Sequence, residues 1–300
     1  MRSLAAHLFT LLLTVAAAGL SRPARAAAWP DGAPGVADGG SRWLGPKPPA
    51  DPRRIVSLAP SLTDTVIGLG HADRLVGVTR YDEAPEVAKL PRVGGFLDPS
   101  TEAVVALRPD LVLWLTDAGG YAAARRLAAL GIPVLAVPLV RVADIFATTR
   151  LIGSVLRDPT AGDRLARSLE ANVEELRRRA AGLPRVRTLL VVGHRPLVVA
   201  GPTSFPGELL ELAGGENVAQ GSRPWAAYPL EKAVHANPDL VIDSAMNEPA
   251  STLDDLSAIP AIRRGAVRRL ATDDLLHPGP RLGIALRELF AALHPEKRSP

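Results

Sequence analysis

The stretch EAVVALRPDLV at residues 102–112 decides the fold, because it returns 129 positions later as EKAVHANPDLV at residues 231–241. Glu, Val, Pro, Asp, Leu and Val occupy identical places in the two copies. Each copy is typical of a short helix, a Pro-Asp turn and a buried strand. A Pro-Asp turn before an apolar strand is common, so the coincident glutamates carry the inference. We expect two halves related by a pseudo-twofold axis, with Glu102 and Glu231 in the same place on each.

Apolar runs alternate with helical patterns along the rest of the chain. The runs lie at residues 55–58, 75–78, 111–115 and 134–137, and then at 188–192, 197–199, 240–242 and 267–270. Such alternation indicates βα units with parallel sheets. The sequence therefore predicts an α/β fold with two lobes.

One long polar helix is predicted between the lobes, from about Asp158 to Ala181, and Gly182 and Pro184 end it. At ~1.5 Å per residue this helix would be roughly 36 Å long, enough to cross a domain. An ordinary surface helix within one domain is the alternative. A bridging helix implies small opening and closing motions of the lobes. The expected division is an N-terminal lobe at residues 53–157, the bridging helix at 158–182 and a C-terminal lobe at 183–300.

Composition and charge exclude some classes of protein. The 300 residues are 47% hydrophobic and 22% charged, which is typical of a folded chain, and the length favours two domains. The net charge is +4, but three arginines fall within residues 1–26, where there is no acid. The remainder has 32 basic and 31 acidic residues. This balance provides no field for a polyanion, so nucleic acid is excluded as a partner.

The N-terminus predicts a secretory signal peptide at residues 1–26. An apolar stretch from Leu4 to Leu20 precedes an Ala-x-Ala cleavage site at Ala24–Ala26. A membrane anchor is the alternative, but the stretch is shorter than the ~20 residues of a span. The chain has no cysteine and hence no disulfide. We expect export to a bacterial periplasm, with residues 27–52 as a flexible leader and the folded part starting near Arg53.

Candidate ligand contacts follow the predicted strands, because open parallel sheets bind ligands at the carboxyl ends of their strands. Aromatic residues make up only 4% of the chain, so those in loops carry weight, although each of them could equally pack inside. Tyr81, Phe96 and Trp225 stand in such loops, where a ring can stack on a flat ligand. Ser61, in contrast, fits a capping box that opens the first helix. The expected ligand-binding residues are Pro60, Tyr81, Phe96, His194, Trp225, Asp273 and His277.

The motifs of common enzymes do not occur in the sequence. It has no G-x-S-x-G, no phosphate-binding loop, no H-E-x-x-H and no G-x-G-x-x-G after the first strand. No two of the histidines after residue 26 stand at a metal-ligand spacing on one predicted element. We therefore expect no catalytic residue, no resident metal and no cofactor. Two alternatives stay open: a hydrolase or metal-dependent enzyme built from Ser57, Asp273 and His277, and a carrier of free zinc or manganese.

An ordered series of motifs then points to a family. The series includes RIVSLAPSLT at residues 54–63, VGGFLD at 93–98, LAGGEN at 212–217 and PGPR at 278–281. From Arg53 to Leu293 the chain resembles the helical-backbone (class III) substrate-binding proteins of ABC importers. The resemblance implies two Rossmann-like lobes bridged by one long helix, with a ligand cleft between the lobes.

The same resemblance implies partners and a ligand. Glu102 and Glu231 match the glutamates that dock into arginine pockets of a permease dimer in the inner membrane, and the carrier is expected to be a monomer. The GGFLD run and the Arg223-Pro224-Trp225 segment are closest to the vitamin B12-binding branch, in which Tyr81, Phe96 and Trp225 match corrinoid-contacting aromatics. His277 stands in a variable segment and leaves a ferric siderophore or haem as the alternative. The expected function is capture and delivery of a cobalamin-like corrinoid.

Overall fold

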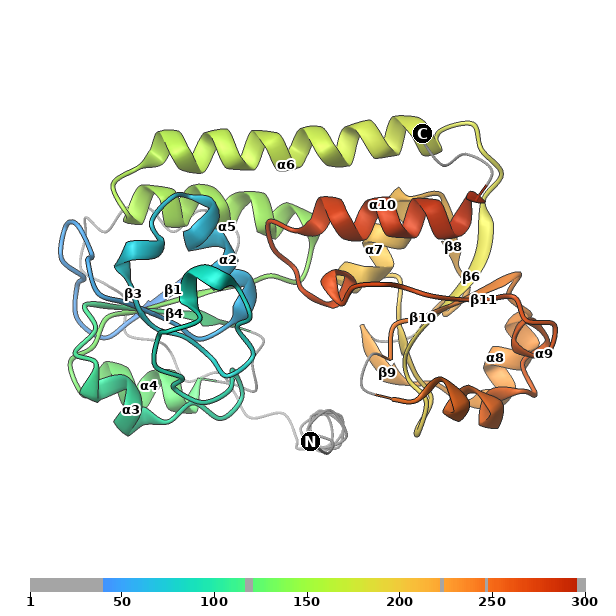
Figure 1. Ribbon diagram of the computed structural model, residues 1–300, viewed down its shortest axis with the longest axis horizontal. Helices are drawn as coiled ribbons and strands as arrows, with labels where there is room; N and C mark the ends of the chain where they lie inside the picture. Colours follow the sequence, from blue (N-terminus) through green and yellow to red (C-terminus); the bar gives the residue numbers. More distant parts are fainter. Residues whose placement is uncertain (1–39, 117–120, 222–223, 246–247, 296–300) are drawn as a thin grey trace. The chain divides into compact units, whose positions relative to one another are not determined.

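The computed structural model describes residues 40–116, 121–221, 224–245 and 248–295 (Figure 1). These residues form two compact units, one ending at Leu169 and the other starting at Glu170. The division falls inside helix α6 (Pro159–Ala180), which confirms the long helix expected at about 158–181. The predicted signal peptide at residues 1–26 lies outside the described residues.

The first unit contains a five-stranded sheet in the order β1-β5-β4-β2-β3. Strands β2, β3, β4 and β5 are parallel, as the alternation of apolar runs predicts. The strands are β1 (Arg42–Leu44), β2 (Ile55–Ser57), β3 (Leu75–Gly77), β4 (Leu111–Leu115) and β5 (Val134–Val137). The helices are α2 (Pro60–Gly68), α3 (Thr101–Ala106), α4 (Ala122–Ala129) and α5 (Val142–Val155), with 3-10 turns η1 (Ala72–Arg74) and η2 (Pro85–Val87).

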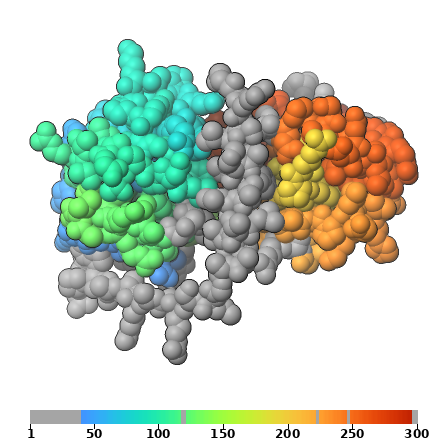
Figure 2. Space-filling view, turned by 90° about the horizontal axis from the view of Figure 1, so that it is seen from below, coloured from blue at the N-terminus to red at the C-terminus, as the bar shows by residue number. Residues whose placement is uncertain are grey.

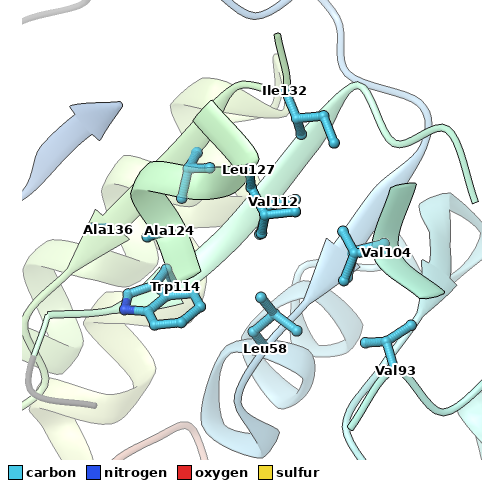
Figure 3. Close-up of a cluster of buried hydrophobic side chains, with 11 residues drawn as sticks. Leu58, Val93, Val104, Val112, Trp114, Ala124, Leu127, Ile132 and Ala136 are labelled. Carbon is cyan, nitrogen blue, oxygen red and sulfur yellow. The ribbon is translucent and has the colours of Figure 1, made fainter. Parts of the chain in front are cut away.

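A cluster of buried apolar side chains joins α3 and α4 to this sheet (Figure 3). Val104 of α3 and Leu127 of α4 pack with Val112 and Trp114 of β4, and all four are at most 2% exposed. Full burial of such a side chain contributes about 1.5–3 kcal/mol. Helix α3, and with it Glu102, is therefore fixed to the sheet through its apolar face.

Residues 27–39 of the predicted flexible leader at 27–52 lie outside the described residues, but strand β1 corrects the expectation for the part from residue 40 onward. Arg42–Leu44 pairs antiparallel with β5, and Trp43 opposite Leu135 is only 7% exposed. Gly45 follows with φ +82°, and a Cβ there would lie 2.6 Å from the carbonyl oxygen of Ile132. The folded part thus begins before Arg53. A three-residue strand within a Pro/Gly/Ala-rich stretch has no periodicity to reveal it.

The start of helix α2 corrects the capping role expected of Ser61. The helix begins at Pro60, and its N-cap residue Ala59 has no side-chain cap bond. Proline suits this position because its φ is already helical and it has no N–H to leave unpaired. Ser61 therefore lies inside the first turn, where it is buried.

The second unit has a six-stranded sheet with the path β11-β10-β6-β7-β9, and β8 also pairs with β6. Strands β8, β10 and β11 run parallel to the neighbours they pair with, whereas β7 and β9 are antiparallel to theirs. The strands are β6 (Val186–Gly193), β7 (Val198–Ala200), β8 (Gly215–Asn217), β9 (Trp225–Ala227), β10 (Leu240–Asp243) and β11 (Val267–Arg269). The helices are α7 (Phe205–Leu212), α8 (Leu230–Ala236), α9 (Pro260–Arg263) and α10 (Leu282–Leu293), with 3-10 segments η3 (Ala250–Leu256) and η4 (Asp274–Leu276).

Both copies of the sequence repeat fold as predicted, into a short helix, a turn and a buried strand: α3–β4 in the first unit and α8–β10 in the second. The match extends to the backbone, because the residues before the two prolines, Arg108 and Asn237, have φ of 45° and 43°. A left-handed residue at this place ends a helix and turns the chain toward the next strand.

An arginine holds the end of each repeat helix in the same way. Arg54 donates from Nη2 to the carbonyl oxygen of Leu107 at 2.7 Å, and Arg187 donates from Nη2 to that of Ala236 at 2.7 Å. Leu107 and Ala236 are equivalent positions of the repeat. The last carbonyls of a helix lack partners within the helix, so each arginine satisfies one of them.

Candidate functional site

The first unit brings two predicted ligand contacts, Tyr81 and Phe96, into direct contact. Their ring centroids are 5.9 Å apart and the rings meet edge to face at 60°. Both rings are half-buried. The loops that carry them are joined by a backbone hydrogen bond of 2.8 Å from Arg80 N to Gly94 O. Residues 15 positions apart in sequence thus form one aromatic surface.

Arg80 and Asp98 lie beside this aromatic pair. The Arg80 guanidinium lies 5.3 Å from the centre of the Tyr81 ring and forms an ion pair with Asp98. The hydrogen bond to Asp98 raises the pKa of the Arg80 guanidinium. Gly95 makes the arrangement possible, because a Cβ there would lie 2.8 Å from Arg80 Nη2 and 3.0 Å from Tyr81 Cε2. The cluster Arg80, Tyr81, Phe96 and Asp98 is called the aromatic cluster below.

A buried carboxylate sets the loop that carries Tyr81. Asp82 is 5% exposed, and its Oδ2 accepts hydrogen bonds from Thr79 N at 2.7 Å and from Thr79 Oγ1 at 2.6 Å. This closed turn presents Tyr81 four residues after the end of strand β3. Pro60 stands three residues after the end of β2, the parallel neighbour of β3, so both residues belong to the loops at the same edge of the sheet. Arg80, Asp82 and Asp98 were not among the expected ligand-binding residues, although they stand in the same loop motifs as Tyr81 and Phe96.

The second unit carries Trp225, Asp273 and His277. Trp225 is 40% exposed and lies in strand β9 opposite Ala200, which corrects its expected place in a loop. The three-residue strand at the sheet edge was hidden by the preceding turn residues. Arg223, expected beside it, lies outside the described residues. The exposed indole remains available for stacking.

Asp273 and His277 form a pair around η4. His277 Nδ1 lies 3.5 Å from Asp273 Oδ1, and the two side chains are 32% and 50% exposed. The hydrogen bond with His277 lowers the pKa of Asp273 below its ordinary value, and the positive charge of Arg281 adds to this effect. Arg281 also contacts the buried Asp274, with Nη1 at 3.1 Å from Oδ1. Asp273 and His277 are thus a partly exposed polar pair, next to the contact between Arg281 and the buried Asp274.

His194 does not lie where a ligand contact was expected. It follows β6 as predicted, but its side chain is 0% exposed. Its Nε2 is 3.0 Å from Asp243 Oδ1, and its Nδ1 meets Thr252 Oγ1 and lies 3.6 Å from Glu248 Oε2. A residue after a strand can point into its unit as well as out of it, and here the ring points inward to the buried carboxylate of Asp243. His194 is a structural residue in this conformation.

Asp243 is the centre of this buried network. Burial pushes the pKa of Asp243 upward, but hydrogen bonds from His194 and from Ala245 N, with the charges of His194 and Arg269, outweigh it, so the pKa lies below its ordinary value. Arg269 Nε lies 3.6 Å from Asp243 Oδ2. The network ties the ends of β6, β10 and β11 together.

Glu102 and Glu231 are exposed on their own units, within the first turn of α3 and of α8. Figure 2 shows the segments around residue 100 (teal) and residue 230 (orange) at the molecular surface. Ser100 Oγ donates to Glu102 Oε2 at 3.2 Å. A backbone hydrogen bond, together with that of Ser100, lowers the pKa of Glu102. Glu231 lines a groove of about 460 Å³ together with Leu230, Val234, His235 and Ala258.

Ser57, the serine expected in the alternative enzyme site, is not accessible to a ligand. Ser57 is fully buried in β2 and is used internally, since Oγ donates to Ala59 O at 3.1 Å and accepts from Thr63 Oγ1 at 2.8 Å. Within the described ranges, no group of three His, Cys, Asp or Glu side chains could hold a metal ion. In the same ranges, no helix combines the length and the apolar character needed to cross a bilayer.

Two α/β units, each with a repeat of short helix, turn and strand, define a binding-protein fold. The model of the family described as periplasmic binding protein matches residues 55–271, and the chain belongs to this family. The family resemblance inferred from the motifs is confirmed.

Individual relatives agree with this assignment. A vitamin B12-binding protein of Yersinia pseudotuberculosis serotype O:3 (strain YPIII) is 30% identical over 207 residues, 68% of this chain and 73% of the relative. The crystal structure of the periplasmic vitamin B12-binding protein of Vibrio cholerae has a TM-score of 0.72 at 23% identity and covers 82% of this chain and 99% of its own. The apo periplasmic heme-binding protein of Roseiflexus sp. RS-1 has a TM-score of 0.71 at 28% identity, with coverages of 82% and 99%. The predicted fold class of two α/β units with parallel strands is confirmed.

Proposed function

We propose that this protein is a periplasmic carrier that captures a cobalamin-like corrinoid and delivers it to an ABC importer, without making or breaking a covalent bond. The observation that carries the proposal is the edge-to-face pair of Tyr81 and Phe96, half-exposed on loops of the first unit. The vitamin B12-binding relative at 30% identity supports the same ligand. The proposed ligand contacts are Pro60, Tyr81, Phe96, Trp225, Asp273 and His277.

The chemistry of the aromatic cluster suits a corrinoid. Stacking that removes ~400 Å² of apolar surface from water provides roughly 10 kcal/mol before ordering costs. Arg80 is already neutralised by Asp98, so the polar part of the cluster carries no net charge. The amide groups at the edge of a corrin ring are neutral hydrogen-bond donors and acceptors. The ion pair of Arg80 and Asp98 can form hydrogen bonds with them, and no unpaired charge remains in the complex.

Haem is the second candidate ligand. His277 offers a partly exposed imidazole, and Tyr81 offers a phenol; both groups can ligate iron. The heme-binding protein of Roseiflexus at 28% identity favours this candidate. Haem carries two carboxylates, for which Arg80 would have to exchange its bond to Asp98.

Export and delivery complete the proposal. Residues 1–26 act as the signal peptide, and the exported protein works as a monomer. Glu102 and Glu231 dock onto the two subunits of an inner-membrane permease. The corrinoid is cargo, so the protein needs neither a cofactor nor a resident metal, and it is not an enzyme. Exposed ion pairs of this kind add orientation and on-rate more than affinity, and they weaken with salt.

Calorimetric and absorbance titrations with cyanocobalamin and with haemin test the ligand. We expect one cobalamin per protein and a loss of about 100-fold in affinity for the double variant Tyr81→Ala/Phe96→Ala, because two aromatic contacts disappear. Leu130→Ala, which alters an exposed side chain on the same unit, is the control and keeps the affinity. A haem Soret band without cobalamin retention would establish the second candidate, and sustained turnover of a ligand would reject the carrier.

A further inference from the structure

The buried histidine of the second unit faces a hydrogen-bond acceptor at each of its two ring nitrogens. His194 Nε2 lies 3.0 Å from Asp243 Oδ1. Because the pKa of Asp243 is lowered, this carboxyl is ionised and can only accept, so Nε2 must carry a proton. On the other side of the ring, Nδ1 contacts Thr252 Oγ1 and lies 3.6 Å from Glu248 Oε2.

The hydroxyl of Thr252 decides the state of the second nitrogen. Thr252 has one hydroxyl proton, which it donates to the carbonyl oxygen of Pro249 at 2.7 Å. Toward His194 the hydroxyl oxygen can therefore only accept, so Nδ1 must carry a proton as well. A ring with a proton on each nitrogen is an imidazolium. The hydrogen-bond pattern thus requires a positive charge on a side chain that is 0% exposed.

The charges around the ring lead to the same conclusion. Among the described residues, the charged groups that face this place are Asp243 on β10, Glu248 and Asp255 on the segment after β10, Arg269 on β11 and Arg195 after β6. Arg195 pairs with Asp255, and Arg269 Nε lies 3.6 Å from Asp243 Oδ2. The negative charge of Glu248, 28% exposed, is then balanced only if His194 is positive. A neutral ring would leave one excess negative charge beside buried groups, which is costly.

His194 and Arg195 attach the segment 248–256 to the end of β6. His194 N donates to Glu248 Oε1 at 2.9 Å, the ring of His194 contacts Thr252, and Arg195 pairs with Asp255. The segment follows the carboxyl end of β10, at the edge where open parallel sheets carry their ligand-binding loops. The ring of His194 therefore anchors the middle of a segment at this edge.

We propose that His194 controls this segment through its protonation: the imidazolium holds residues 248–256 on the ends of β6 and β10, and loss of one proton releases them. The proton leaves from Nδ1 and passes to solvent, because Nε2 faces an ionised carboxylate at 3.0 Å. The bare Nδ1 then faces oxygen lone pairs of Thr252 and Glu248. Thr252 can donate to it only by giving up its bond to Pro249 O, which opens the first turn of η3. The inference goes beyond the carrier function and does not depend on the ligand.

The test follows two signals of the unsubstituted protein over one pH series. We expect both ring nitrogens of His194 to resonate as protonated nitrogens at about pH 6 in ¹⁵N NMR. As the pH rises and Nδ1 loses its proton, hydrogen exchange in residues 249–256, corrected for its intrinsic pH dependence, should become about tenfold faster. The two changes should share one midpoint, while residues 188–192 of β6 keep their protection. A single protonated ring nitrogen at about pH 6, or exchange that does not follow the ring, would overturn the inference.

Three variants separate the protonation of His194 from its packing. His194→Gln keeps an amide in the same place but cannot titrate in this range, so exchange in residues 249–256 should no longer depend on pH. Thr252→Val removes the acceptor of Nδ1 and should speed exchange about tenfold at about pH 6, whereas Thr252→Ser retains the hydroxyl and should retain the protection. Thermal unfolding checks that each variant is folded. A pH response that persists in His194→Gln contradicts the proposal; where that variant does not fold, equal exchange in the two Thr252 variants does so.

Discussion

The copy of the repeat at α3–β4 and the copy at α8–β10 agree in their framework and differ in their exposed and capping residues. Both have a left-handed residue before the proline and an arginine on the last helical carbonyls. Both place the glutamate of the repeat on an exposed face. The framework recurs because backbone groups must be satisfied in the same way in each unit. The residues around it are under no such constraint.

The largest difference lies at the equivalent positions 114 and 243. In the first unit the position is Trp114, 2% exposed in the apolar cluster, whereas in the second it is Asp243, 0% exposed in a polar network with His194. One register position therefore supports either an apolar core or a buried hydrogen-bonded network. Variants at equivalent positions of the two copies test how each copy is stabilised.

Asp243→Ala should have the largest effect, about 3–5 kcal/mol lost from the free energy of unfolding of the second unit, because it leaves both the buried His194 Nε2 and Ala245 N without their hydrogen-bond partner. Trp114→Phe is the control at the equivalent position and should cost about 1–2 kcal/mol, since it removes only part of an apolar side chain. Urea unfolding followed by hydrogen exchange in residues 240–243 and 111–115 separates the units. Equal costs at the two positions would contradict the assigned network.

The same network predicts a dependence on pH with a definite sign. Because the pKa of Asp243 is lowered in the fold, its contribution is present above the ordinary aspartate value of about 3.9 and is lost as the pH falls through the lower folded value. Acid unfolding below about pH 4 should therefore affect the second unit first. In Asp243→Asn this additional acid sensitivity should disappear, and an unchanged acid profile would argue against an ionised Asp243.

Removal of the arginine that binds the last carbonyls of each repeat helix should have the next largest effect on the free energy of unfolding. Arg54→Ala and Arg187→Ala each leave a helix-end carbonyl without its charged donor, and we expect about 1–2 kcal/mol for each. Arg54 also donates to Arg108 O at 3.1 Å, whereas Arg187 pairs with Glu216 at 2.8 Å, so similar values are expected from different second contacts. Chemical denaturation measures both, and Arg263→Ala serves as the control at an exposed arginine of α9. A loss of stability in only one of the two variants would show that the two copies do not share this stabilising contact.

Ser100→Ala should cost about 1 kcal/mol, because Ser100 Oγ caps α3 by accepting from Ala103 N at 3.1 Å. It should also move the pKa of Glu102 upward toward its ordinary value, since one of the hydrogen bonds that lower it is lost. Carboxyl NMR signals report that pKa. Ser257→Ala, at an exposed serine of the second unit, is the control. An unchanged pKa of Glu102 would contradict the contact with Ser100.

Substitution by glycine at the two left-handed positions should have the smallest effect on stability, and the two variants can be compared directly. Arg108→Gly should stabilise the first unit by about 0.5 kcal/mol, because glycine adopts a positive φ without steric cost, although it also gains freedom in the unfolded chain. Asn237→Gly should give less, since asparagine tolerates this conformation better than arginine does. Thermal unfolding of each variant measures the difference. A loss of stability in Arg108→Gly would indicate that its side chain has a role of its own.

Strands that consist of continuous apolar residues could be predicted from the sequence. The runs at 55–58, 111–115, 134–137 and 240–242 became strands because buried parallel strands need continuous apolar residues. Strands β1, β8 and β9 were missed, since each has three residues and their pairing is decided by neighbours far away in the chain. Whether such short strands form depends on their pairing with distant segments, which no local sequence pattern encodes.

The candidate site was predictable by residue type but not by orientation. Tyr81 and Phe96 were found because aromatics are rare in this chain and both stand in loops. His194 was misplaced because sequence cannot show whether a residue after a strand points inward, and its partners Asp243 and Thr252 are 49 and 58 residues away. The pairing of Arg80 with Asp98 could not be predicted, because it depends on Gly95, which leaves room for the side chains of Arg80, Tyr81 and Asp98 to come together.

Strand β1 has a consequence for the order in which the chain is completed. It is the most N-terminal strand of the first sheet, yet its partner β5 follows about ninety residues later. A polypeptide that is synthesised amino end first therefore carries this segment unpaired until β5 has been made. Because β5 is made late, the pairing of β1 and the burial of Trp43 complete the folding of this unit and do not nucleate it.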